Sequence, residues 1–348
     1  MELNRILIRA DAGGITGTGH VLRMIALAQA YLRRGGSVSL ASVNCPETLV
    51  ERVRSHGIMH HTIKAAQSGD SEDARLTAEL AQELGVQWLV VDGYHFDYDY
   101  QKHVKQSGLS LLCTDDHGYS DRWHCDAILN QNLDADLEIE YKSDLPDTRI
   151  LAGSRFCLFR EEFLSSQTAK RTWGRIESLL VTLGGSDAEN ATEATLKLLD
   201  QSATFPLEIR VLAGAENPHI QRLRSFKSHH YIQVVQNATN MPEQYAWADG
   251  IISAGGSTCW EWLYLGLPGA IVTIADNQLP IVQALTEQRQ AALPLGWFND
   301  FNTNVPCAEL ESWLKDPSSI VDSNVAYGLI DGLGAERVCQ FLAGGFEF

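Results

Sequence analysis

The clearest sign of chemistry in this sequence is His20, which ends a glycine-rich turn near the start of the chain. The turn runs from Gly13 to Gly19 and follows the short apolar segment Ile6-Leu7-Ile8. A glycine turn between a strand and a helix lets backbone N–H groups approach an anionic ligand. The positive end of the helix dipole predicts a lowered pKa for His20, and hence the neutral imidazole that a general base requires. The alternative is a solvated histidine at an ordinary β–α turn.

Two further glycine turns stand in the second half of the chain. Gly255-Gly256-Ser257-Thr258 follows an apolar segment and opens a predicted helix, and its hydroxyls can donate to phosphate oxygens. Gly184-Gly185-Ser186-Asp187 repeats the same order of strand, turn and helix. Both turns also fit a capping box, Thr258 with Glu261 and Ser186 with Glu189, which needs no ligand. We predict that the three turns direct helix N-termini at one ligand, with Glu261 either capping its helix or binding ribose hydroxyls.

Polar residues follow several other apolar segments. Asp92 and Tyr94 end one of them, and Asp115-Asp116-His117 ends another. Such strand ends line the ligand side of a parallel sheet, although aspartates are also common in turns. Asp115-Asp116 with His117 could hold a metal, but no third well-spaced ligand set is present, so we expect neither a metal nor another cofactor. Asn277-Gln278 is predicted to reach a uracil edge or a sugar hydroxyl, with a solvated loop as the alternative.

These motifs lie within two successive series of alternating strands and helices. Strands are predicted at 5–10, 37–43, 87–92, 110–114, 127–130 and 149–151, and again at 178–183, 207–212, 232–235, 250–253 and 269–274. Helices are predicted at 21–32, 77–84, 190–199, 241–247 and 260–265, and the chain from about Leu279 is predicted to be mostly helical. The pattern indicates an α/β protein of two Rossmann-like parallel-sheet domains, with the ligand in the cleft that they face.

Composition limits the partners that this chain can have. Its 348 residues carry a formal net charge of −17, which argues against nucleic acid but leaves room for a single nucleotide. No apolar run approaches the roughly 20 residues of a membrane helix. The seven cysteines form no CxxC pair, and the first residues lack the features of a signal peptide, so we expect a cytoplasmic protein.

Taken in order, the motifs of this chain resemble the UDP-2,4-diacetamido-2,4,6-trideoxy-β-L-altropyranose hydrolases of pseudaminic acid biosynthesis, a family related to the spore coat protein SpsG. The resemblance runs nearly end to end. The matching motifs are Arg9-x-Asp11, Gly17-x-Gly19-His20-x-x-Arg23, Asp92-x-Tyr94, Asp115-Asp116, Asp126-x-x-x-Asn130, Arg160-x-Glu162-Phe163, Gly184-Gly185-Ser186-Asp187-x-x-Asn190, Gly214-x-x-Asn217-Pro218, Gly255-Gly256-Ser257-Thr258-x-Trp260-Glu261, Leu265-Gly266-x-Pro268, Asn277-Gln278 and Asp331-Gly332-x-Gly334-Ala335-x-Arg337-Val338.

The resemblance implies a GT-B fold and a metal-independent hydrolase that releases UDP by inverting attack of water on the anomeric carbon. It implies a sugar-binding catalytic domain at 1–165, a UDP-binding domain at 173–325, and a C-terminal helix at 326–348 that packs back on the first domain. The predicted catalytic residues are His20 as base, with Tyr94 and Asp11. The predicted substrate-binding residues are Arg9, Gly17, Gly19, Arg23, Gly185, Ser186, Asn217, Gly256, Ser257, Thr258, Glu261, Asn277 and Gln278.

Other functions also fit these motifs. A GT-B glycosyltransferase would use a sugar or lipid hydroxyl in place of water, and a hydrolase of a related UDP-diacetamido sugar would need nearly the same pocket. A UDP-sugar epimerase shares the fold, and a silent nucleotide-sugar-binding protein is a further alternative. We expect a monomer or weak oligomer whose partner is the UDP-sugar.

Overall fold

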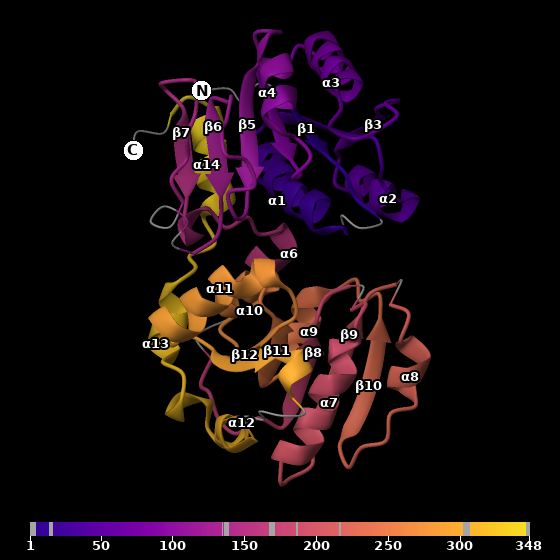
Figure 1. Ribbon diagram of the computed structural model, residues 1–348, viewed down its shortest axis with the longest axis vertical. Coiled ribbons are helices and arrows are strands. Elements are labelled where there is room, and N and C mark those ends of the chain that lie inside the picture. The colour runs from indigo at the N-terminus through magenta and orange to yellow at the C-terminus, as the bar shows by residue number, and fades with distance from the viewer. Residues whose placement is uncertain are drawn as a thin grey trace. The chain divides into compact units, whose positions relative to one another are not determined.

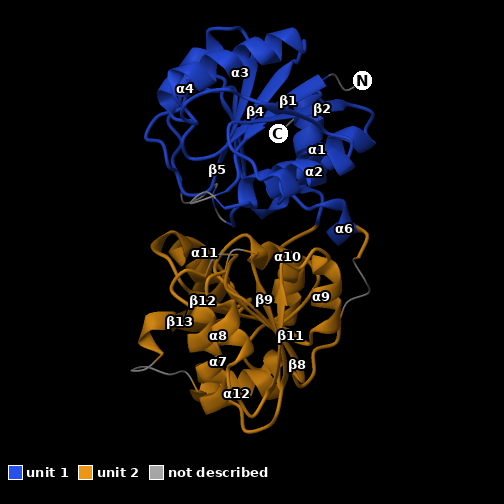
Figure 2. Cartoon of the chain, turned by 90° about the vertical axis from the view of Figure 1, so that its right-hand side faces the viewer, with its two compact units in different colours: residues 1–164, 332–348 blue, residues 165–331 orange. Residues whose placement is uncertain are grey.

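The chain forms two compact units in the computed structural model, which describes residues 5–13, 17–133, 135, 139–166, 171–185, 187–215, 217–301 and 307–345. Unit 1 comprises Met1–Leu164 and Gly332–Phe348, and unit 2 comprises Ser165–Asp331 (Figure 2). Each unit has its own parallel sheet and its own apolar core. No helix among these described residues is long and apolar enough to cross a bilayer.

Unit 1 is built on a seven-stranded sheet in the order β3-β2-β1-β4-β5-β6-β7, with every neighbouring pair parallel (Figure 1). The strands are β1 (Arg5–Ala10), β2 (Ser37–Ser42), β3 (Met59–Thr62), β4 (Trp88–Asp92), β5 (Ser110–Asp115), β6 (Ala127–Asn130) and β7 (Arg149–Ala152). The helices are α1 (Gly19–Arg33), α2 (Glu47–Ser55), α3 (Ser71–Glu83), α4 (Tyr98–Lys105), α6 (Glu161–Leu164) and α14 (Gly334–Leu342), with a short 3₁₀ turn at Ser154–Phe156.

The apolar sequence of β1 reflects burial on both faces of this sheet. Ile6 and Ile8 belong to a core that also contains residues of α1 and α14. Leu7, whose side chain points to the opposite face, belongs to a second core with residues of α3 and α4. A parallel sheet covered by helices on both sides needs such continuous apolar strands.

The chain returns to unit 1 at its C-terminal end through α14. Ala335, Val338 and Leu342 of this helix are buried in the same core as β1. Gly334 packs so closely that a Cβ added there would lie 2.2 Å from the carbonyl oxygen of Cys157. The preceding helix, α13 (Ser323–Gly328), lies in unit 2, and unit 1 resumes at Gly332.

Unit 2 carries a six-stranded parallel sheet in the order β10-β9-β8-β11-β12-β13. The strands are β8 (Ser178–Thr182), β9 (Glu208–Ala213), β10 (Tyr231–Gln236), β11 (Gly250–Ala254), β12 (Gly269–Thr273) and β13 (Leu293–Trp297). The helices are α7 (Ala191–Ser202), α8 (Ile220–Arg224), α9 (Met241–Trp247), α10 (Thr258–Tyr264), α11 (Leu279–Gln283), α12 (Cys307–Lys315) and α13, with a π-helical turn at Ala284–Gln288 and short 3₁₀ turns at Asp276–Gln278, Phe298–Asp300 and Pro317–Ser319.

The predicted class of two parallel-sheet α/β domains is confirmed, and the predicted strands lie within about two residues of those observed. Two strands were missed, and each lies at the edge of its sheet. β3 reads Met-His-His-Thr and is only partly buried, while β13 contains Pro294 and Gly296 in a region predicted to be helical. Edge strands are solvated on one side and tolerate proline, so they lack the apolar run that marks a central strand.

The strand order reverses once in each unit, and these reversals fix where ligands bind. In unit 1 the chain moves outward from β1 to β2 and β3, then returns to place β4 on the other side of β1. In unit 2 the same reversal lies between β8 and β11. Open α/β sheets bind ligands at such switch points, beyond the carboxyl ends of the strands. The residues that follow β1 and β4 therefore define a candidate site in unit 1, and those that follow β8 and β11 define a candidate site in unit 2.

Candidate active site

His20 and Asp92 meet at the switch point of unit 1. His20 Nδ1 lies 2.7 Å from Asp92 Oδ1, and His20 as a whole is 9% exposed. Asp92 ends β4 and is fully buried, and its Oδ1 also accepts a hydrogen bond from the Thr114 hydroxyl at 2.6 Å. A carboxylate at this distance fixes the tautomer in which Nδ1 carries the proton and Nε2 is free to act as a base.

Arg23, one turn further along α1, joins this pair to a second carboxylate. Its Nε donates to Asp92 Oδ2 at 2.9 Å, and its Nη1 donates to Asp116 Oδ1 at 2.5 Å. Tyr94 donates its hydroxyl to Asp116 at 2.8 Å, and its ring meets the His20 ring edge-on at 5.1 Å. Two carboxylates therefore hold the guanidinium of Arg23, a predicted substrate-binding residue, within this cluster.

The pKa of His20 is shifted in the direction opposite to the one that the sequence predicted. Burial of the His20 ring disfavours its charged form, but the Asp92 carboxylate outweighs burial, with help from Asp116, and raises the pKa of His20. The predicted lowering by the helix dipole is therefore wrong, because a carboxylate in direct contact acts more strongly than the partial charge of a helix end. Burial likewise opposes ionisation of Asp92, yet Arg23 and His20 lower the pKa of that carboxyl.

Asp11, predicted to be catalytic, has both carboxylate oxygens occupied. Oδ1 accepts the backbone N–H groups of Val43 and Asn44 at 2.8 and 2.9 Å. Oδ2 lies 2.8 Å from Arg9 Nη1 and 3.1 Å from His95 Nε2. Burial opposes its ionisation, but His95 and Arg9 lower the pKa of Asp11 far below its usual value. Asp11 therefore holds Arg9, His95 and the Val43–Asn44 backbone in place, and its catalytic role stays a prediction.

Arg9 lies beneath this carboxylate and has no exposed surface. Its Nε and Nη2 donate to the two oxygens of Asp73 at 3.0 and 2.7 Å, and its Nη1 faces Asp11. Arg9 was predicted to orient the sugar, but a fully buried guanidinium cannot touch a ligand. It neutralises two buried carboxylates and so holds Asp11 in place.

Gly17 and Gly19 lie at the start of α1. Gly17 has φ +68°, a conformation that favours glycine, and its carbonyl accepts the N–H of Gly13 at 2.8 Å. Gly19 is the first residue of the helix. Residues 14–16 of the same turn lie outside the described part of the chain.

The adjacent carboxylates Asp115 and Asp116 face different partners. Asp115 accepts backbone N–H groups of Gly118 and Tyr119 and the hydroxyl of Tyr141, whereas Asp116 pairs with Arg23. They therefore do not form the metal-binding pair that the sequence left open.

A separate group in unit 2 has the composition of a metal site. One ligand atom from each of Asp200, His229 and His230 lies within 4.8 Å of the others. However, His230 Nδ1 accepts the backbone N–H of Leu207 at 3.3 Å, which leaves the ring proton on Nε2, the atom that would have to face the ion. The group precedes β10, away from the carboxyl ends of the strands.

In unit 2, the turn after β8 packs against the turn after β9. A Cβ added at Gly214 would lie 2.1 Å from the carbonyl oxygen of Gly185, so this contact requires glycine. The predicted capping box is wrong at this turn, because α7 begins at Ala191 and Asp187 caps it by accepting the N–H of Ala191 at 2.8 Å. Ser186, a predicted substrate contact, lies outside the described residues.

Asn217 follows β9 in the same region and is 6% exposed. Its Oδ1 accepts the N–H of His219 at 2.8 Å, while its Nδ2 has no hydrogen-bond partner among the described residues. A buried amide donor without a partner is costly, which favours its completion by a ligand.

The turn after β11 is the second glycine turn of unit 2. A Cβ at Gly255 would lie 2.6 Å from Val282 Cγ2, whereas one at Gly256 would meet open space. Ser257 occupies the N-cap position of α10 without a side-chain capping bond, and Thr258 is the first helical residue, so the predicted Thr258–Glu261 capping box is wrong. Glu261 Oε2 instead accepts the hydroxyl of Tyr245 at 2.8 Å.

Asn277 and Gln278 lie in the 3₁₀ turn after β12. Gln278 Oε1 accepts the N–H of Ile274 at 3.1 Å, so this side chain closes its own turn, whereas Asn277 is exposed. Of the two, Asn277 is the residue with a side chain open to solvent.

Three residues important to the site were not among the predicted site residues: Asp92, Asp116 and His95. Asp92 ends β4, Asp116 directly follows β5, and His95 lies three residues after β4, so their place at the ends of apolar strands was the available signal. The sequence does not reveal which of several polar strand ends will meet His20 or Asp11, since that depends on strand order.

Known proteins resemble this chain in its sequence and in its fold. A family model described as the glycosyltransferase family 28 C-terminal domain matches residues 178–289, which include both glycine turns of unit 2. The chain is 24% identical over 277 residues to UDP-2,4-diacetamido-2,4,6-trideoxy-β-L-altropyranose hydrolase of Campylobacter jejuni, covering 79% of this chain and 93% of that one. It is 22% identical to the spore coat polysaccharide biosynthesis protein SpsG of Bacillus subtilis, covering 83% of each.

A third relative is an uncharacterised protein of Methanocaldococcus jannaschii, 24% identical over 79% of this chain. This chain spans 56% of that relative's length.

Solved structures define the class of fold. The MurG structure from Acinetobacter baumannii covers 98% of this chain and 99% of its own, with a TM-score of 0.65 at 16% identity. The calicheamicin glycosyltransferase CalG4 covers 99% of this chain and 98% of its own, with a TM-score of 0.60 at 13% identity. The protein has the GT-B fold of these glycosyltransferases.

Proposed function

We propose that this protein is a UDP-sugar hydrolase that cleaves the bond between UDP and the anomeric carbon of a 2,4-diacetamido-2,4,6-trideoxy sugar. The observation that carries the proposal is the His20–Asp92 pair at the switch point of unit 1. Support for the UDP-sugar comes from the family model over unit 2 and from the relative in Campylobacter jejuni. The sugar proposed is the one in that relative's name, 2,4-diacetamido-2,4,6-trideoxy-β-L-altropyranose.

In this proposal His20 activates water. Its Nδ1–H donates to Asp92, which leaves Nε2 to accept a proton as water attacks the anomeric carbon. Asp92 then stabilises the imidazolium that forms, and Thr114 and Arg23 keep the carboxylate oriented. Attack from the side opposite UDP inverts the configuration at that carbon. Tyr94, whose ring lies beside His20, is proposed to contact the sugar or the water.

Unit 2 is proposed to hold UDP. The open position at Gly256 lets the backbone approach the diphosphate, with the Ser257 and Thr258 hydroxyls as donors. Asn217 and Asn277 are proposed to contact the nucleotide, and Glu261 the ribose. UDP is a good leaving group, because a terminal phosphate has a second pKa near 6. We therefore propose that neither a metal nor another cofactor is needed. We also propose a place in the reducing cytoplasm, since the seven cysteines are scattered and form no CxxC pair.

A glycosyltransferase is the second candidate, favoured by the description of the matching family model. The same histidine would then activate a hydroxyl of an acceptor instead of water. The two candidates are separated by incubating the protein with the UDP-sugar alone and following both products. The hydrolase proposal predicts equal amounts of UDP and free sugar, with the free sugar appearing first as the inverted anomer by NMR. An intact donor that turns over only after an acceptor is added would contradict it.

A further inference from the structure

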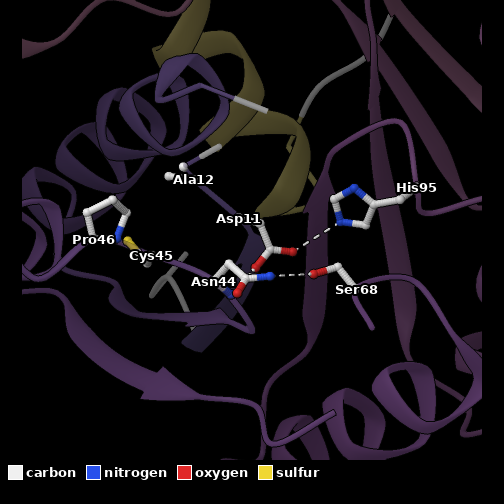
Figure 3. Close-up of a pocket in the computed structure, with 8 residues that line it drawn as sticks. Asp11, Ala12, Asn44, Cys45, Pro46, Ser68 and His95 are labelled. Carbon is white, nitrogen blue, oxygen red and sulfur yellow. Dashed lines mark hydrogen bonds and ion pairs between the residues drawn. The ribbon is translucent and has the colours of Figure 1, made fainter. Parts of the chain in front are cut away.

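A second feature of unit 1 lies beside the His20–Asp92 pair. It is a cavity of about 490 Å³ lined by Asp11, Ala12, Gly13, Asn44, Cys45, Pro46, Ser68 and His95 (Figure 3). These residues follow the carboxyl ends of β1, β2, β3 and β4. Its volume is within the range of small-ligand pockets, roughly 300–1,000 Å³.

The cavity is unsuited to an anion. Among the described residues that line it there is no lysine or arginine, and their one carboxylate, Asp11, is already paired with Arg9. The backbone N–H groups of Ala12 and Gly13 donate to Asn44 and Gly17 at 2.9 and 2.8 Å. The backbone N–H of Asn44 donates to Asp11 Oδ1. These three amides therefore cannot also donate to a phosphate or carboxylate.

Its walls suit a neutral group with one polar and one apolar end. Ala12, Cys45 and Pro46 form an apolar side, and Asn44, Ser68 and His95 provide hydrogen-bonding groups on the other (Figure 3). Burial, with Asp11 and Glu47, raises the pKa of the Cys45 thiol to about 11, so this wall is uncharged. Asn44 Nδ2 donates to Ser68 Oγ over 3.4 Å, a long bond that a ligand can replace at little cost.

The cavity is one strand away from the proposed catalytic pair. Its residues gather over β1 and β2, whereas His20 and Asp92 meet over β1 and β4, and neighbouring strands lie about 4.8 Å apart. Two consecutive residues link the sites, since the Tyr94 ring contacts His20 at 5.1 Å and His95 Nε2 contacts Asp11 at 3.1 Å. A group held in the cavity therefore belongs to the part of the sugar across the ring from the anomeric carbon.

We infer that this cavity binds the N-acylamino group at C4 of the sugar, an inference that rests on the proposed function. The amide N–H is accepted by Asn44 Oδ1, the amide carbonyl receives a hydrogen bond from Asn44 Nδ2 or Ser68, and the methyl group packs against Pro46. An amide presents a donor, an acceptor and a methyl group, which is the set of groups that these walls match. The nitrogen at C2 is only two bonds from the anomeric carbon, so we place that group beside His20 and the C4 group in this cavity.

The test compares two UDP-sugars that differ only in carrying acetamido or hydroxyl at C4. We expect wild-type kcat/KM to favour the acetamido sugar at least about tenfold, as pockets discriminate by the groups they bury. Asn44→Leu should remove most of this preference, since Asn44 is exposed and its backbone bonds to Asp11 and Ala12 persist. Gln67→Leu, a matched change at an exposed neighbour outside the cavity, should keep the preference. Equal wild-type kcat/KM values, or an equal loss on both sugars in Asn44→Leu, would overturn the inference.

A binding measurement separates failure of the subsite from failure of the proposed function. If neither UDP-sugar is cleaved, the hydrolase proposal fails, and saturation-transfer NMR with the free 2,4-diacetamido sugar still tests the cavity. Strongest saturation of the C4 acetamido methyl, lost in Asn44→Leu and kept in Gln67→Leu, would support the subsite. Absence of transfer to that methyl would overturn it.

Discussion

His20 Nδ1 and Asp92 Oδ1 lie 2.7 Å apart although 72 positions separate them in the chain. The contact arises because β4 returns to the side of β1, so the end of β4 lies next to the helix that follows β1. A buried carboxylate that already accepts bonds from Thr114 and Arg23 holds this histidine in one tautomer. The predictions below test what this pair does.

Replacing His20 tests whether it is the base. His20→Asn should lower kcat by roughly 10²–10⁴-fold, the usual contribution of a positioned base. UDP affinity by calorimetry should stay close to that of the wild type, because His20 belongs to unit 1 and the proposed UDP site lies in unit 2. His229→Asn, a histidine change in unit 2 remote from the strand carboxyl ends, is the control and should keep full activity. An equal loss of UDP affinity and kcat in His20→Asn would make His20 a binding residue.

Replacing Asp92 tests the origin of the raised pKa. Because His20 acts as a base in its neutral form, kcat/KM should rise with pH through the His20 pKa, which the Asp92 carboxylate raises above the usual 6.5. Asp92→Asn removes this negative charge, so the acidic limb should move to lower pH while kcat falls by about 10²-fold or more. Thermal unfolding serves as the control for folding. If the acidic limb of the kcat/KM profile stays at the same pH in Asp92→Asn, a group other than His20 controls it.

Arg9 should matter for stability rather than for binding. Arg9→Met leaves Asp73 and Asp11 buried without their cation, which should lower the free energy of unfolding by about 3–5 kcal/mol. Arg75→Met is a matched control, because Arg75 also pairs with two carboxylates but lies exposed on α3, so its loss should change stability little. Urea unfolding measures both. Similar effects of the two changes would contradict the buried-pair account.

Two glycines of unit 2 should respond differently to alanine. Gly214→Ala places a Cβ 2.1 Å from the Gly185 carbonyl oxygen and should lower both the melting temperature and UDP affinity. Gly256→Ala meets open space and should leave the melting temperature unchanged while weakening UDP binding, since the added methyl group occupies the proposed diphosphate position. Normal UDP affinity in Gly256→Ala would remove this turn from the nucleotide site.

Chelation tests the expected independence from metal. Turnover should be unchanged after treatment with EDTA, because Asp92 and Asp116 are held by Arg23 and Asp115 by backbone amides. Loss of activity that one divalent cation restores would contradict the proposed mechanism.

The fold could largely be predicted from the sequence because the central strands are continuous apolar segments. β1 and β6 begin and end at the predicted residues, since both faces of each are buried and the apolar run has clear limits. The edge strands β3 and β13 were missed because partial solvation permits histidines, proline and glycine.

The candidate site was predictable only in part. Glycine turns and His20 stand out locally, but the partners of His20 and Asp11 come from β4 and the loop after it, which only the strand order brings near. The predicted direction of the His20 pKa shift was wrong for the same reason. The prediction considered only the helix that carries His20, whereas Asp92 comes from β4. From the sequence, Arg9 and Arg23 were interpreted as cations that bind the ligand. In the structure, carboxylates accept hydrogen bonds from both guanidinium groups.

The most direct test of the central claim is hydrolysis of UDP-2,4-diacetamido-2,4,6-trideoxy-β-L-altropyranose in ¹⁸O-labelled water without an acceptor. Mass spectrometry of the two products shows which bond is broken. Attack of water on the anomeric carbon predicts label in the free sugar and none in UDP. Label in UDP would mean attack at phosphorus, and an intact substrate would mean that water is not the acceptor; either result would contradict the account.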